Sequence, residues 1–92
     1  MTERKILVLA RRDHTEAMRV AAGLTIAGHE IRIVFMTTPV KETPENAEQA
    51  EILELSEIEP ETTVKEMSGQ AAFLDDSALG SAISESDIVI NV

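Results

Sequence analysis

Residues 5–36 constrain the fold of this chain more than any other stretch. Residues 5–10, Lys-Ile-Leu-Val-Leu-Ala, form an uninterrupted aliphatic run, which is typical of a central parallel strand covered on both faces. A helix is expected at residues 14–27, and residues 31–36 form a second hydrophobic run. A strand, a helix and a strand joined by short turns predict a βαβ unit with a right-handed crossover.

The helix of this unit carries its own start and stop signals. Asp13 and Glu16 have the spacing of a capping box, which places the start of the helix at His14. Gly28 follows the last predicted turn, and glycine accepts the left-handed conformation that ends many helices. The face expected to pack on the sheet is a broad stripe of small and aliphatic side chains, namely Ala17, Ala21 and Leu24 with Met18, Ala22 and Ile26 beside them.

The signals after residue 36 are weaker. Thr43 followed by Pro44 predicts the first residues of a helix that runs to about residue 58. We expect this helix to be marginal, mobile or stabilised by a partner, because its glutamates wind around it instead of holding one face. We interpret them as a solvated surface, with a contact surface for a basic partner as the alternative. They recur every three residues, at Glu45, Glu48, Glu51, Glu54 and Glu57.

The last third of the chain predicts three further elements. Pro60 ends the preceding helix, and residues 62–67 indicate a third strand followed by a turn at residues 68–70. A short apolar run at residues 71–74 then leads to the final elements. These are a helix capped by Asp75 and Asp76, which carries Leu79, Ala82 and Ile83, and a buried strand at residues 87–92.

Alternation of strands and helices over this length predicts the α/β class. We expect a single domain over residues 1–92, a three-layer α/β/α sandwich around a mostly parallel sheet of four to five strands. A chain of 92 residues buries enough surface for one modest core. The apolar fraction of 43% argues against disorder.

Charge is unevenly distributed along the chain. Residues 1–40 carry six basic and four acidic side chains, a net charge of +2, whereas residues 41–92 carry two basic and thirteen acidic ones, a net charge of −11. This balance, together with only two aromatic residues and no Trp or Tyr, argues against nucleic acid as a partner. The first apolar run is too short for a signal peptide or a membrane span, so we expect a cytoplasmic protein with no membrane partner.

Ligands of parallel sheets bind beyond the carboxyl ends of the strands. The polar elbow at residues 11–14 follows the first strand, and two arginines and a histidine beside a helix N-terminus suit a phosphate, sulfate or carboxylate. The alternative, which we favour, is that Asp13 caps the helix and the arginines are solvated. The candidate ligand-binding residues at these strand ends are Arg11, Arg12, Asp13, His14, Thr37, Thr38, Ser68 and Gly69.

Catalytic and metal chemistry have little support in the sequence. His14 lacks an accompanying serine or cysteine motif, so we assign no catalytic residue and favour a protein that is not an enzyme. His29, after the helix-ending glycine, is interpreted as a surface residue. Two histidines and scattered carboxylates give no metal-ligand spacing, and glycine-rich nucleotide motifs are lacking, so no metal and no cofactor is predicted.

The chain resembles the DsrE/DsrF-like proteins over nearly its whole length. The resemblance rests on the strand at residues 5–10, the helix with Ala21-Ala22-Gly23-Leu24 and Ala27-Gly28-His29, the strand at residues 31–36 with Val40 soon after, and the closing Asp87-Ile88-Val89-Ile90. It implies an α/β/α domain that assembles into homo-oligomers or hetero-oligomers with related subunits, and a role in intracellular sulfur transfer.

Sulfur-carrying members of that family bear the persulfide on a cysteine near the end of a middle strand. The corresponding region here is residues 64–69, and the chain contains no cysteine. Ser68 is no substitute, because a hydroxyl neither stores a sulfane sulfur nor acts as a soft nucleophile. The resemblance therefore implies a non-catalytic accessory subunit.

Association with other subunits is also expected on physical grounds. A sheet of four or five strands built from 92 residues has few elements to cover its faces and edges. The resemblance to the DsrE/DsrF-like proteins implies trimers or hexamers, so we expect a dimer, trimer or hexamer, or a hetero-oligomer with related subunits. The alternative hypothesis is a binding module for a small anion or nucleotide that uses the elbow at residues 11–14.

Overall fold

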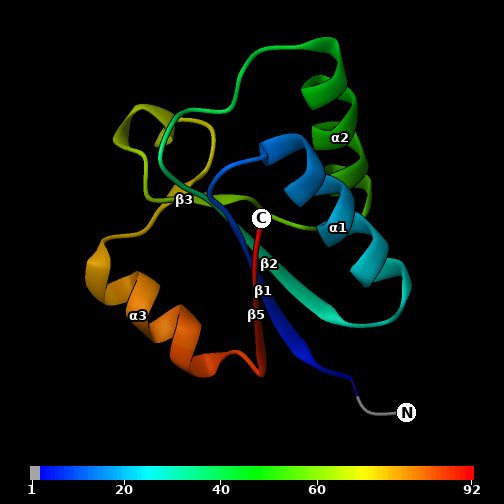
Figure 1. The fold of residues 1–92 in the computed structure, drawn as a ribbon, viewed down its shortest axis with the longest axis vertical. Helices are drawn as coiled ribbons and strands as arrows, with labels where there is room; N and C mark the ends of the chain where they lie inside the picture. The colour runs from blue at the N-terminus through cyan, green and yellow to red at the C-terminus, as the bar shows by residue number, and fades with distance from the viewer. Residues whose placement is uncertain (1–2) are drawn as a thin grey trace.

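The computed structural model describes residues 3–92, which form three helices packed on a five-stranded sheet in which every neighbouring pair of strands is parallel (Figure 1). In chain order the elements are β1 (Lys5–Ala10), α1 (His14–Ile26), β2 (Glu30–Phe35), α2 (Pro44–Leu55), β3 (Glu61–Thr62), the 3-10 helix η1 (Lys65–Met67), β4 (Ala72–Phe73), α3 (Asp76–Glu85) and β5 (Ile88–Asn91).

The strand order β4-β3-β2-β1-β5 explains the three layers. The chain moves outward from β1 to β4 and then returns to the other side of β1 for β5. Right-handed crossovers in these two directions place their helices on opposite faces of the sheet. α1 and α2 accordingly lie on one face and α3 on the other, as Figure 1 shows with the sheet viewed along its β5 edge. The predicted three-layer α/β fold is confirmed.

The central strand β1 supplies both halves of the core. Val8 faces the α1 layer and Leu7 the α3 layer, and both side chains are fully buried. This two-sided burial is the reason that β1 reads as a continuous aliphatic run instead of an alternating one. Among residues 3–92 the α1 side of the core is much the larger, since the α3 side of that range holds four buried residues, Leu7, Leu9, Val34 and Ala82.

The start and stop signals of α1 act as predicted. Asp13 Oδ1 accepts a hydrogen bond of 3.0 Å from the Glu16 amide, and the helix ends at Ile26, one residue before the predicted end. Gly28 has a φ of 92°, the left-handed conformation expected of a helix-ending glycine.

α2 is shorter than predicted. Thr43 caps it and Pro44 opens it as expected, but it ends at Leu55 instead of residue 58. The amide of Ile58 donates back to the Leu53 carbonyl, and Glu57 has a φ of 61°, so the chain has already left the helix there. Only Asn46 and Leu53 of this helix are buried, in agreement with its predicted weak amphipathicity.

The third strand is present but much shorter than the predicted range of residues 62–67. β3 ends at Thr62, whose hydroxyl donates to the Phe35 carbonyl at 2.9 Å and accepts from the Val64 amide at 2.9 Å. This local bond to a residue two positions ahead turns the backbone out of the sheet, and residues 65–67 form η1 instead.

β3 is joined to β2 by a bidentate ion pair. Arg32 Nε donates to Glu61 Oε1 at 2.8 Å and Arg32 Nη2 donates to Glu61 Oε2 at 2.7 Å, and this pairing raises the pKa of Arg32.

The predicted burial of the final strand is also wrong. β5 pairs with β1 alone and forms an edge of the sheet, and its residues are half-buried or exposed. α1 packs over β1 and β2 and α3 is short, so neither layer reaches over β5 completely. The helix before it is confirmed, with Asp75 as its cap, Ala82 buried and Ile83 exposed.

Candidate functional site

The elbow after β1 lies where parallel sheets commonly bind ligands. The strand order reverses between β1 and β5, and the carboxyl ends of strands at such a reversal flank a crevice. A cavity of about 380 Å³ occupies this place. It is lined by the residues that follow or end three adjacent strands, namely Arg11 and Arg12, Thr37, and Asn91 with Val92.

Two backbone donors of this elbow, and one of the first helical turn, already have protein partners. The amides of Arg11 and Arg12 both donate to the Val92 carbonyl, at 2.9 and 2.8 Å, and Asp13 takes the Glu16 amide as the helix cap. The guanidinium groups of Arg11 and Arg12 are the cationic donors that this cavity offers to an anion.

His14 is held by contacts with the end of β2. Its Nε2 lies 3.2 Å from the Met36 carbonyl, and its ring meets Phe35 edge-on with centroids 5.5 Å apart. The imidazole is thereby held at the first turn of α1, and it does not line the elbow cavity. His29, at the other end of α1, accepts from the Arg4 amide at 3.3 Å.

The remaining candidate residues do not join the elbow. Thr38 is exposed, and its amide donates to the Met36 carbonyl. Ser68 and Gly69 line a different cavity of about 590 Å³ beside β3 and β4, together with residues 59–61 and 70–72. The structure therefore brings together Arg11, Arg12 and Thr37 and separates them from Ser68 and Gly69.

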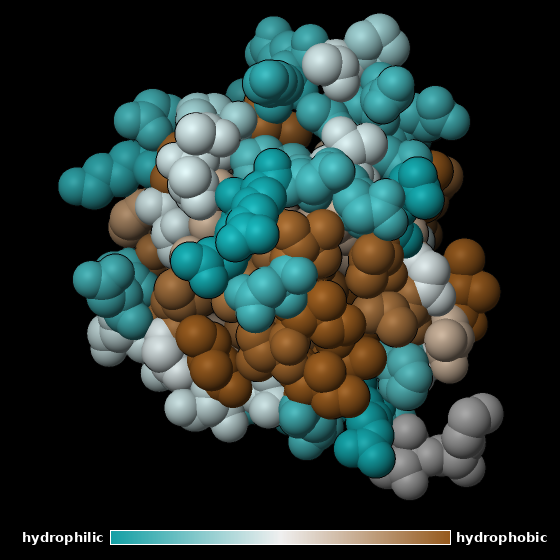
Figure 2. Space-filling view, viewed as in Figure 1, coloured by the Kyte–Doolittle hydropathy of each residue, from teal (hydrophilic) through white to brown (hydrophobic). Residues whose placement is uncertain are grey.

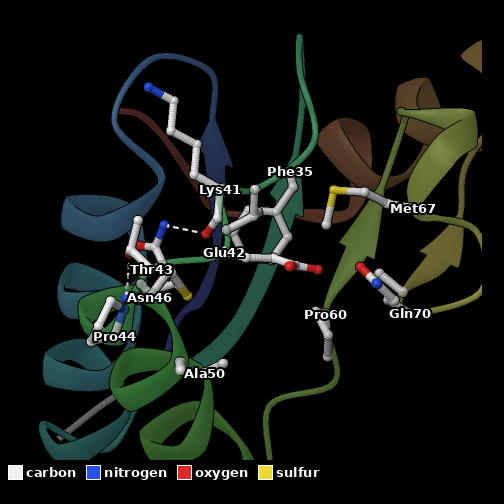
Figure 3. Close-up of a pocket in the computed structure, with 14 residues that line it drawn as sticks. Phe35, Lys41, Glu42, Thr43, Pro44, Asn46, Ala50, Pro60, Met67 and Gln70 are labelled. Atoms are coloured by element: carbon white, nitrogen blue, oxygen red, sulfur yellow. Dashed lines mark hydrogen bonds between the residues drawn. The ribbon is translucent and has the colours of Figure 1, made fainter.

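A groove that the sequence did not indicate lies between α2 and the segment from β3 to η1. It consists of two neighbouring cavities of about 490 and 560 Å³. Figure 3 shows the first of them, bounded by residues 41–50 on one side and by Pro60, Met67 and Gln70 on the other. The sequence feature most closely related to this groove is the weak amphipathicity of α2, because a helix with little apolar surface packs loosely on a core.

Neither a cluster of metal-ligating side chains nor a membrane-spanning helix is found in the described part of the chain. Within residues 3–92 there is no group of three or more His, Asp or Glu side chains placed to hold a metal ion. No helix of that same range combines the length and the apolar character needed to cross a bilayer.

Comparisons of the chain with protein-family models, with curated proteins and with solved structures gave no match in any of the three.

Proposed function

We propose that this chain is a cytoplasmic, non-catalytic accessory subunit of the DsrE/DsrF-like kind, which assembles with further copies of itself through the β5 edge of its sheet. The order of its elements supports the family resemblance, and the lack of cysteine leaves no group to carry a persulfide. Because every copy lacks cysteine, the role of this assembly in sulfur transfer is to support separate, cysteine-bearing subunits that carry the sulfur.

The unprotected β5 edge is the observation that carries this proposal. Soluble proteins usually blunt an edge strand with charges, proline, a bulge or very short length. β4, at the opposite edge, has only two residues, whereas β5 presents Ile88-Val89-Ile90-Asn91 with no charge and no proline. An apolar, unpaired edge of this kind is a template for another strand.

The surface around this edge is apolar as well. Figure 2 shows hydrophobic side chains gathered over β5 and the adjoining part of α3. Ile88 is 39% and Ile83 41% exposed, and both are large aliphatic residues. A contiguous apolar patch on a small protein commonly marks an interface.

A second copy of the chain is the partner that fits this surface best. Two β5 strands can pair antiparallel about a two-fold axis, because each presents the same uncharged surface to the other. The pairing would continue the sheet from one subunit into the next and cover both patches.

Analytical ultracentrifugation at micromolar concentration tests the proposal. We expect the unmodified chain to sediment as an oligomer, and Ile88→Lys and Ile83→Lys to shift it toward the monomer, because a lysine at an edge must be desolvated on pairing. Leu55→Lys is the matched control, since Leu55 is 78% exposed at the end of α2. An unmodified chain that stays monomeric, or an Ile88→Lys variant that assembles normally, would contradict the proposal.

A mass measurement tests the non-catalytic part separately. After incubation with a persulfide donor, the intact mass of the chain should show no added sulfur. A stable adduct of one sulfur atom would show that another residue carries sulfur and would refute this part alone.

An anion-binding module is the second candidate, because the elbow cavity with Arg11 and Arg12 lies at the reversal of strand order. Thermal stabilisation by phosphate or sulfate that disappears in the Arg11→Ala, Arg12→Ala double variant would favour it. Absence of stabilisation by either anion would exclude it.

A further inference from the structure

The groove beside α2 has the size of a ligand site. Its two cavities, of about 490 and 560 Å³, share Met18, Phe35, Ala50, Pro60 and Gln70 in their walls. They are therefore two lobes of one depression. Small-molecule sites in proteins commonly have a volume of about 300–1,000 Å³ and mostly apolar walls.

The position of α2 explains why this space is open. α2 packs chiefly against α1, and its contacts with the sheet are few. Figure 1 shows the two helices side by side on their face of the sheet, while η1 and the β3 region lie apart from them. The groove therefore lies beside the carboxyl end of β2, with α2 on one side of it and η1 on the other.

The floor of the groove is apolar and firmly placed. Met18 on α1, Phe35 on β2 and Met67 on η1 line it, and each of the three belongs to the buried core. These side chains are only 2–5% exposed, so the floor offers a small surface that is apolar and polarizable. The walls therefore suit the body of an apolar molecule.

The charge at the rim is negative. In Figure 3 the Glu42 side chain extends toward the space in front of Phe35 and Met67, whereas Lys41 directs its amino group away from the cavity. Glu54, Glu57 and Glu59 line the second lobe. Within residues 3–92 none of these four glutamates takes part in an ion pair.

The segment that carries Glu42 is anchored at both neighbouring residues. Asn46 is buried, and its Nδ2 donates to the Lys41 carbonyl at 2.9 Å. The amide of the same Asn46 donates to the Thr43 hydroxyl at 3.1 Å. Glu42 is thus held between two fixed points beside the apolar floor.

We propose that this groove binds a small apolar molecule that carries a positive charge, such as an alkylammonium ion. Its apolar body lies on Met18, Phe35 and Met67, and its cationic group meets the Glu42 carboxylate, with the glutamates of the second lobe excluding anions. This site is separate from the β5 edge, so it stands or falls independently of the proposed assembly.

Thermal denaturation with octylammonium, octanol and octanoate tests this inference. The three probes share one chain length and differ in charge. We expect octylammonium to raise the melting temperature of the protein more than octanol does, and octanoate to raise it least. Burial of the alkyl group is common to all three probes, whereas the carboxylates attract the cation and repel the anion. Equal stabilisation by all three probes, or none by octylammonium, would overturn the proposal.

Two variants locate the site. Glu42→Gln should weaken octylammonium binding about threefold to tenfold, the range expected when a partly exposed charged partner is lost. Glu45→Gln is the matched control, because Glu45 is an exposed residue of α2 that lines neither lobe. Ala50→Phe, which fills the shared wall of both lobes, should abolish binding. Equal affinity in the Glu42→Gln and Glu45→Gln variants, or full affinity in Ala50→Phe, would refute the assignment.

Discussion

Single polar residues determine where the helices of this protein begin. Asp13, Thr43 and Asp75 each precede a helix, and the side-chain oxygen of each accepts a hydrogen bond from the amide three residues later, at 3.0, 3.1 and 2.8 Å. All three caps were identified from the sequence, because a cap depends on residues close together in the chain. Thr62 shows the limit of such local signals, since its hydroxyl bonds both to its neighbour Val64 and to Phe35 on another strand.

Gly28 gives a prediction at the scale of one residue. Gly28→Ala should lower the free energy of unfolding by about 1–2 kcal/mol, because a side chain is strained at a φ of 92°. Gly23→Ala, within α1 and with open space around its Cα, should instead stabilise the protein by about 0.5–1 kcal/mol. Urea denaturation of both variants measures the difference, and equal effects of the two substitutions would contradict the assigned conformation.

At the scale of elements, α1 and α2 differ in how they are stabilised. α1 buries four residues against the sheet and α2 buries two, one of which is the polar Asn46. Asn46 bonds to Thr15 of α1 and to the Lys41 carbonyl. α2 is therefore positioned as much by polar contacts as by apolar burial, which its sequence pattern indicated only as a weak amphipathic face.

α2 should be less stable locally than α1. Its amides should exchange with solvent faster than those of α1, because a helix with little buried apolar surface opens more easily than the core. Thr43→Ala removes its cap and should destabilise the helix by about 0.5–2 kcal/mol, which accelerates exchange in α2 and leaves α1 unchanged.

Hydrogen-exchange mass spectrometry measures both rates. Thr38→Ala is a suitable control, since Thr38 is exposed and precedes α2 outside its cap. Uniform acceleration across α1 and α2 would show instead that the two helices open as one unit.

The whole molecule combines an apolar edge with a strongly acidic charge. The net charge is −9, so copies of the chain repel one another, and in the proposed assembly this repulsion opposes the pairing of the apolar β5 edges. The balance depends on salt, because added ions screen repulsion over a distance of about 10 Å at 0.1 M and leave apolar contacts intact.

Assembly should therefore strengthen with ionic strength. Sedimentation velocity in buffers of rising sodium chloride concentration should show a growing oligomeric fraction at constant protein concentration. A fraction that falls with added salt would indicate that ion pairs, and not the apolar edge, hold the subunits together.

The sequence by itself determined the βαβ unit at residues 5–36, the class of fold and the helix caps, because each depends on periodicity or on neighbours a few residues apart. It also placed Arg11, Arg12 and Thr37 at strand ends, where the structure joins them in one cavity. β1 and β2 are neighbouring parallel strands, so their carboxyl ends lie at the same edge of the sheet and the residues that follow them meet there.

Only the tertiary structure decided which strand became an edge and where a cavity opened. The aliphatic composition of β5 resembles that of the buried β1, and its exposure follows from its place beyond β1 in the strand order. The groove between α2 and η1 depends on the docking of a helix whose own pattern specifies no face. Both features arise from contacts between distant segments, which local sequence patterns do not encode.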